Sequence, residues 1–189
     1  MLYHLKEKSE NFIMKMEGAR CIDSRFNVHY FLPVDNSLEI EEMLPCESEF
    51  LLKQFKLMGY YDVVFVDMSS AFGLSNIKIL EVCDEILLVL LEDNISISRA
   101  KIFAGELDML SKGKNLLLED KMNIILNRYE ADTSSGTQDV RFFDKAVLIK
   151  IPLCIEPLCF DGQEQFLGPG PEFEAAIERL LYKLAFGSE

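Results

Sequence analysis

Four short runs of apolar residues, rich in β-branched side chains, constrain the fold of this 189-residue chain more than any other feature. They span residues 63–66, 86–91, 122–126 and 146–151. Continuous apolar runs of this length are typical of strands in a parallel sheet that helices cover on both faces. A fifth run, residues 28–32, stops at Pro33. We therefore predict a mostly parallel sheet whose strands are buried on both faces.

Helical patterns alternate with these runs. Leu51, Phe55 and Met58 repeat at i, i+4 and i+7 after Pro45, and Gly59 then predicts the helix end. Two further apolar stripes comprise Ala100, Phe103, Ala104, Leu107 and Leu110, and then Phe173, Ala176, Ile177, Leu180, Leu181 and Leu184. Because strands and helices alternate, we predict a three-layer α/β fold that forms a single domain over residues 1–189.

The composition excludes several classes of function. The net charge is −13 and no Lys/Arg cluster interrupts the acidity, which argues against direct binding of nucleic acid or anionic lipid. Two histidines, and five cysteines without a CxxC pair, leave little material for Ser-His-Asp, Cys-His or zinc chemistry. The longest apolar run, residues 86–91, is too short to span a membrane, and the first residues lack a signal-peptide core. We expect a cytoplasmic protein without a transmembrane segment.

One carboxylate stands out among the polar residues that follow the apolar runs. Asp67 ends the run 63–66, as in a Walker B strand, whose carboxylate holds magnesium opposite nucleotide phosphates. An acidic residue at a strand end is also a common turn former or helix N-cap, so this alternative stays open.

An ordered set of segments carries a family resemblance. It comprises residues 61–67 (YDVVFVD), 83–89 (CDEILLV), 95–110, 122–128 (MNIILNR) and 149–152 (IKIP). Together, over residues 28–185, they resemble the MinD/ParA superfamily of P-loop ATPases, whose fold is Rossmann-like. Within it, the overall texture is similar to the CpaE/TadZ-like branch, which acts in pilus assembly and polar localisation.

The resemblance implies a nucleotide site for ATP and Mg²⁺. It makes Asp67 the magnesium-side carboxylate, Asn127 the base-reading amide with Arg128 beside the base, and places Pro152 near the adenine. An amide offers a donor and an acceptor to a purine edge. Alternatively, Asn127 caps a turn and Arg128 pairs with a surface acid, and the sequence from Asn127 to Glu130 leaves guanine as a minor option.

Two departures from the family put nucleotide hydrolysis in doubt. None of the ten glycines belongs to a G-x-x-x-x-G-K-[ST] phosphate loop. The family's first strand, phosphate loop, first helix and second strand would precede residue 1, so we expect this chain alone not to build a complete phosphate site. After Asp67, Ser69 and Ser70 stand where the family has a switch motif and could still bond a phosphate. A degenerate ATPase fits these departures.

The resemblance implies a spatial organiser that dimerises with ATP and acts in pilus assembly or polar localisation. Its expected partners are a second copy of the chain and other pilus, secretion or positioning proteins. These other proteins would recruit it to the inner face of the membrane or to a cell pole. The alternative is a non-catalytic interaction module on the same fold. A receiver domain is the least favoured reading, because the gap between Asp67 and Lys150 is too long for that fold.

Overall fold

A computed structural model of the chain shows two compact units, residues 1–83 and 84–189. It describes residues 11–24, 26–32, 42–69, 73–114, 116–130, 141–142, 144–154 and 170–186. The expected organisation as a single domain stays a prediction.

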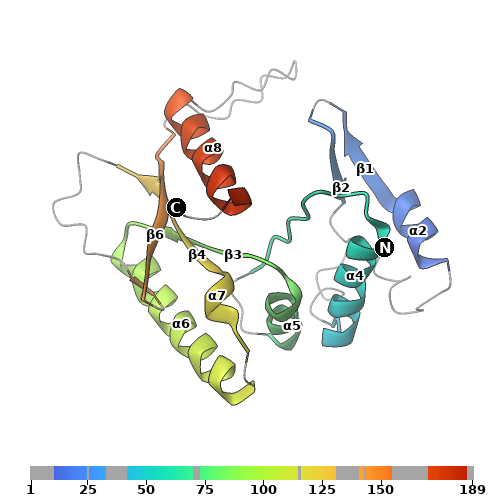
Figure 1. Cartoon of the computed structure of the whole chain (residues 1–189), viewed down its shortest axis with the longest axis horizontal. Helices are drawn as coiled ribbons and strands as arrows, with labels where there is room; N and C mark the ends of the chain where they lie inside the picture. Colours follow the sequence, from blue (N-terminus) through green and yellow to red (C-terminus); the bar gives the residue numbers. More distant parts are fainter. Residues whose placement is uncertain are drawn as a thin grey trace. The chain divides into compact units, whose positions relative to one another are not determined.

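In the part of the first unit that the structure describes, a β-hairpin accompanies the helices α2, α4 and α5 (Figure 1). Its elements are α2 (Phe12–Ala19), β1 (Arg20–Asp23), β2 (Val28–Phe31), α4 (Pro45–Met58) and α5 (Leu74–Val82). β1 and β2 pair antiparallel, so the predicted run 28–32 is a strand of a separate two-stranded sheet. Phe12 and Met16, one helical turn apart, are buried against Phe31 and the apolar face of α4.

The helix predicted after Pro45 is confirmed as α4, and its ends follow from its sequence. Pro45 occupies the first helical turn, where a missing N–H costs nothing. The backbone N–H of Leu44 donates to Oε2 of Glu47 over 2.8 Å, which ties the incoming chain to the first turn. Gly59 ends the helix with a φ of 62°, in the left-handed region that glycine adopts without a steric penalty.

The prediction of a buried strand at residues 63–66 is wrong. The structure assigns no strand there, and all four side chains are exposed, Phe65 by 76%. A parallel strand needs hydrogen bonds from neighbouring strands and helices on both faces. Among the described residues no strand pairs with this segment, so its apolar composition alone does not make it a strand.

The second unit contains the parallel sheet. Its elements are β3 (Ile86–Leu91), α6 (Asn94–Lys114), α7 (Leu118–Lys121), β4 (Met122–Tyr129), β5 (Arg141–Phe142), β6 (Lys145–Pro152) and α8 (Pro171–Phe186). The sheet order is β3-β4-β6-β5, in which β3, β4 and β6 run parallel and β5 is antiparallel to β6. The apolar runs that begin at residues 86, 122 and 146 are therefore confirmed as strands.

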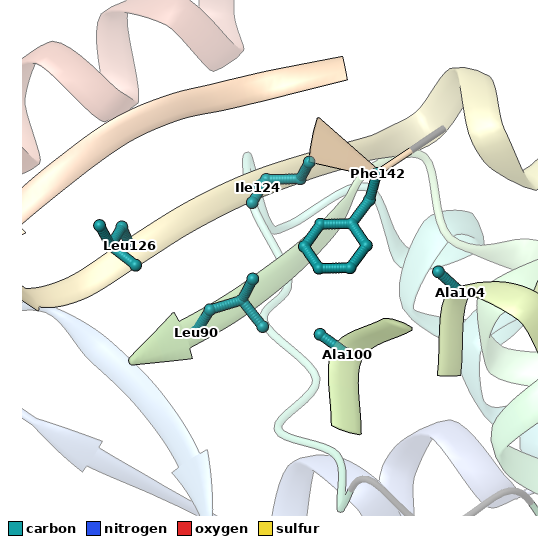
Figure 2. Packing of buried hydrophobic residues seen from close by; sticks show 6 residues of the cluster. All are labelled: Leu90, Ala100, Ala104, Ile124, Leu126 and Phe142. Atoms are coloured by element: carbon teal, nitrogen blue, oxygen red, sulfur yellow. The ribbon is translucent and has the colours of Figure 1, made fainter. Parts of the chain in front are cut away.

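Alternate residues of β4 face two different helical layers. Ile124 and Leu126 lie in the cluster that contains Ala100 and Ala104 of α6, and Figure 2 shows Ala100 between Leu90 and the Phe142 ring on one side and Ala104 on the other side of that ring. Ile125 points to the opposite face, where it packs with the buried side chains of α8. This period of two, with a helix on each face, confirms the predicted three-layer α/β fold.

The apolar stripe of α8 is only partly buried. Ala176 and Leu180 pack on the sheet, and Nζ of Lys183 donates to the carbonyl of Leu148 over 3.0 Å. Leu181, which the stripe predicted to be in the core, is instead exposed, because it lies about 100° around the helix from Leu180. Within the described ranges, no helix has the length and apolar character needed to cross a bilayer.

Substitution of one buried residue in β4 tests how the core is packed. Leu126 is 1% exposed, and we expect Leu126→Ala to lower the free energy of unfolding by about 2 to 5 kcal/mol through lost burial and a cavity. The control is Leu117→Ala, because Leu117 is 72% exposed and its truncation should change stability by about 0.5 kcal/mol or less. Urea unfolding followed by circular dichroism measures both; equal losses would contradict this packing.

The helix end at Gly59 gives a second test. Gly59→Ala should destabilise the first unit by about 1 kcal/mol, because alanine resists a φ of 62°. The matched control is Gly18→Ala in α2, where a Cβ meets open space and should stabilise by about 0.4 to 1 kcal/mol. Opposite signs in urea unfolding support the left-handed cap at Gly59, and the same sign would argue against it.

Candidate functional site

The carboxyl ends of β3, β4 and β6 meet at one edge of the sheet, because the three strands are parallel. Leu91 of β3 is in register with Asn127 of β4, and Tyr129 of β4 with Pro152 of β6. The backbone N–H of Leu153 extends this pairing by donating to the carbonyl of Tyr129 over 3.0 Å. In open parallel sheets, this edge is where ligands bind.

A bulge at the end of β4 shapes this edge. The pairing of β4 with β6 shifts register between Leu126 and Tyr129, and Arg128 has a φ of 56°. The backbone N–H of Arg128 donates to Oδ1 of Asn127 over 2.9 Å, which satisfies a donor that the bulge takes out of the ladder. The left-handed backbone of a non-glycine residue costs free energy and often marks a functional position. Asn127 is half-buried and Arg128 is exposed.

An aromatic ring and a cation lie at the same edge, a pair that the sequence pattern does not predict. Nζ of Lys150 on β6 lies 4.3 Å from the centroid of the Tyr129 ring on β4. A lysine over an aromatic face is a cation–π contact, worth about 0.5 to 1 kcal/mol where exposed. The separation of 21 residues conceals this pair in the sequence; only strand pairing brings the two side chains together. The edge thus offers an amide, a guanidinium and a ring capped by an ammonium.

The residues that follow β3 stabilise the start of α6. Oδ1 of Asp93 accepts the backbone N–H groups of Ile95 and Ser96 over 2.9 and 2.8 Å, and so caps α6. Oγ of Ser96 in turn accepts the N–H of Leu91, which joins the helix start to the end of β3. The first amides of α6 therefore already bond a carboxylate of this chain.

The other predicted site residues belong to the first unit. Asp67 is exposed and follows the irregular segment 63–66, not a strand. Ser69 is exposed, and its carbonyl accepts Nδ2 of Asn76 over 3.5 Å; Ser70 lies outside the described residues. The structure thus brings Asn127, Arg128 and Pro152 to one sheet edge, and the roles predicted for all six residues stay predictions. In the described part of the chain, no three His, Cys, Asp or Glu side chains gather as a metal site.

The comparisons with known proteins agree with this architecture. No protein-family model matches the sequence, and no curated protein does. Among solved structures, a chain of the MinC:MinD cell division protein complex from Aquifex aeolicus matches with TM-score 0.67 and 18% identity, over 98% of this chain and 72% of that one. MinD from the same organism matches with TM-score 0.64 and 16% identity, over 100% and 80%.

A ParA family ATPase from Chlorobium tepidum TLS matches with TM-score 0.55 and 21% identity, over 74% of this chain and 54% of that one. Identities this low show the fold alone. The fold expected from the ordered sequence segments, that of the MinD and ParA ATPases, is thereby confirmed. The finer assignment to the CpaE/TadZ-like branch stays a prediction.

Substitution of Asp93 tests whether this carboxylate stabilises the start of α6. We expect Asp93→Ala to destabilise the second unit by about 0.5 to 2 kcal/mol, since two helix amides lose their acceptor. Asp93→Asn keeps an acceptor oxygen and should retain most of the stability in thermal unfolding. An asparagine variant as unstable as the alanine variant would contradict the capping role.

Proposed function

We propose that this chain, which has the fold of the MinD and ParA ATPases, is an ATPase-like spatial organiser whose own residues form the base side of a nucleotide site. The observation that carries the proposal is the edge where Asn127, Arg128 and Pro152 lie together. An amide held at a fixed strand end suits a purine, because it can donate to and accept from the same base edge.

The phosphate side of such a site does not fit the residues present. The sequence contains no G-x-x-x-x-G-K-[ST] loop, and a phosphate needs such backbone amides and a lysine around it. The N-terminus of α6 starts near the same edge, but its first amides already bond Asp93. Asp67, the candidate magnesium carboxylate, follows no strand that would hold it rigidly. No hydrolytic step follows from these residues. The degenerate ATPase expected from the sequence stays a prediction.

The finer parts of the proposal rest on the family resemblance. The protein would act in pilus assembly or polar localisation, form a homodimer around ATP, and bind other positioning proteins at the inner face of the membrane or a cell pole. One matched structure is a complex of MinD with a second protein, MinC, which supports a role through partners. The resemblance also gives Asp67, Ser69 and Ser70 a role in binding Mg²⁺ and phosphate, but these residues belong to the first unit and the base-side proposal does not depend on them.

A second candidate function is a non-catalytic interaction module on the same fold. The exposure of the segment that leads to Asp67 favours it. The two candidates differ in one property, which is whether nucleotide binds at the carboxyl ends of β4 and β6.

Calorimetric titration of the chain with adenosine, ATP and GTP, each with magnesium, tests the proposal. We expect Asn127→Ala to weaken adenosine and ATP binding about tenfold through loss of a buried amide contact. Because the base side carries the affinity, adenosine and ATP should bind about equally. The matched control is Asn123→Ala at the opposite end of β4, where Nδ2 donates to Glu85 over 2.6 Å; this variant should bind as the original chain does.

Three outcomes would decide against parts of the proposal. No heat with any nucleotide would support the interaction module. A strong preference for ATP over adenosine that Asp67→Asn removes would mean that the phosphate side is functional after all. Equal losses in the Asn127 and Asn123 variants would place the nucleotide away from this edge.

A further inference from the structure

α6 carries apolar side chains on two opposite faces. Its inner face is buried through Ala100, Ala104 and Leu107. Its outer face carries Ile95, Ile102 and Met109, which are 64% to 70% exposed. A surface helix normally presents polar residues opposite its core face, and a helix that is apolar on both sides is normally covered on both. The outer face of α6 therefore has the composition of a contact surface.

The three exposed side chains form a straight seam. They are spaced seven residues apart, a spacing that returns to nearly the same side of a helix and is the repeat of paired helices. From Ile95 to Met109 the seam runs about 21 Å along the helix. Ser98 and Gly105 occupy the intervening positions, and a Cβ added at Gly105 would meet nothing within 4 Å. Large and small residues thus alternate along a face that the described residues leave open.

Charged residues flank the seam with opposite signs in its two halves. Arg99 and Lys101 lie in the first half, and Glu106 and Asp108 in the second. Asp108 pairs with Lys112 over 2.7 Å, whereas Arg99, Lys101 and Glu106 form no ion pair with another described residue. The distribution is self-complementary when one such helix is reversed against another.

We propose that the outer face of α6 binds α6 of a second copy of this chain, in an antiparallel helix pair. A two-fold axis between residues 103 and 104 places Ile102 opposite Gly105 of the second copy. The same axis places Met109 opposite Ser98 of that copy, so each of these two large side chains meets a small one, and Ile95 lies opposite Lys112 at the ends of the contact. In a two-fold contact every such pair occurs twice.

The charges fit the same register. Arg99 lies beside Glu106 of the second copy and Lys101 beside Asp108 of it, which gives four attractive pairs once the symmetry is applied. Over its whole length, Asn94–Lys114, α6 carries four basic and two acidic residues. In a chain of net charge −13 it is thus a surface where two copies can approach with little repulsion.

The parallel arrangement fits less well. In it, identical residues meet, so Gly105 would face Gly105 and leave a gap, and Lys112 would face Lys112. Lys101 would still pair with Glu106 of the other copy, but Arg99 would lose its acidic partner. The antiparallel pair also needs no nucleotide, so it is a contact distinct from dimerisation around ATP. A single helix pair is a small interface, and its affinity should be micromolar or weaker.

Sedimentation velocity in EDTA, without nucleotide, tests the contact over a wide range of chain concentrations. We expect a reversible monomer–dimer equilibrium that Ile102→Lys weakens about tenfold or more, because the contact loses a buried isoleucine from each copy. The matched control is Leu57→Lys, which charges an exposed position on α4, 75% against 64% at Ile102, and should leave the equilibrium unchanged. Unaltered circular dichroism shows that both variants remain folded.

Charge reversal tests the orientation. Arg99→Glu should weaken the dimer, and adding Glu106→Arg should restore it, because the reversed pair is again complementary in the antiparallel register. In the parallel register the double variant would set the introduced arginine against Lys101 and weaken the dimer further. A chain that stays monomeric at its highest soluble concentration, or an Ile102→Lys variant that associates as the original does, would overturn the proposal. Failure of the double variant to recover would overturn the antiparallel register.

Discussion

The backbone hydrogen bonds that hold β4 between β3 and β6 are the constraint on which the second unit depends. Strand pairing on both edges satisfies the peptide groups of β4, so its side chains can be buried on both faces. Ile124 and Leu126 then serve the α6 layer and Ile125 the α8 layer. If β4 lost either neighbour, one helical layer would lose its support and buried peptide groups would lack partners.

The same strand positions the candidate site. The bulge after Leu126 turns Arg128 outward, and the Asn127 side chain stabilises the bulge by accepting the N–H of Arg128. The bond from the Arg128 N–H therefore holds the Asn127 amide in place. A purine would bind to the donor and acceptor capacity of this amide that the bond does not use. Asp93 consumes the first amides of α6 in the same way. Asp93 occupies the amides that could bind a phosphate, whereas the Asn127 amide can still bind a base. A site that binds only the base of a nucleotide is therefore physically reasonable.

Particular residues show how far the sequence could predict this result. The runs 86–91, 122–126 and 146–151 were predicted as strands, and the helix ended by Gly59 was predicted from its spacing. The run 63–66 has the same local composition and failed, because a strand also needs a neighbour to bond. Asn127 and Pro152 were predicted as site residues from the family resemblance. The contact of Lys150 with Tyr129 could not be, because the register of β6 on β4 creates it.

By itself the sequence determined the alternation of strands and helices, the acidic charge, the lack of a phosphate loop and the MinD/ParA-like order of segments. Each of these properties depends on neighbouring residues or on a sum over the chain, so residue types and their spacing are enough to predict it. Only the tertiary structure decided which apolar runs are buried, where β4 bulges, and which face of α6 remains open. Those outcomes depend on which strand or helix lies next to each segment. That neighbour is determined by contacts between residues that are distant in the sequence.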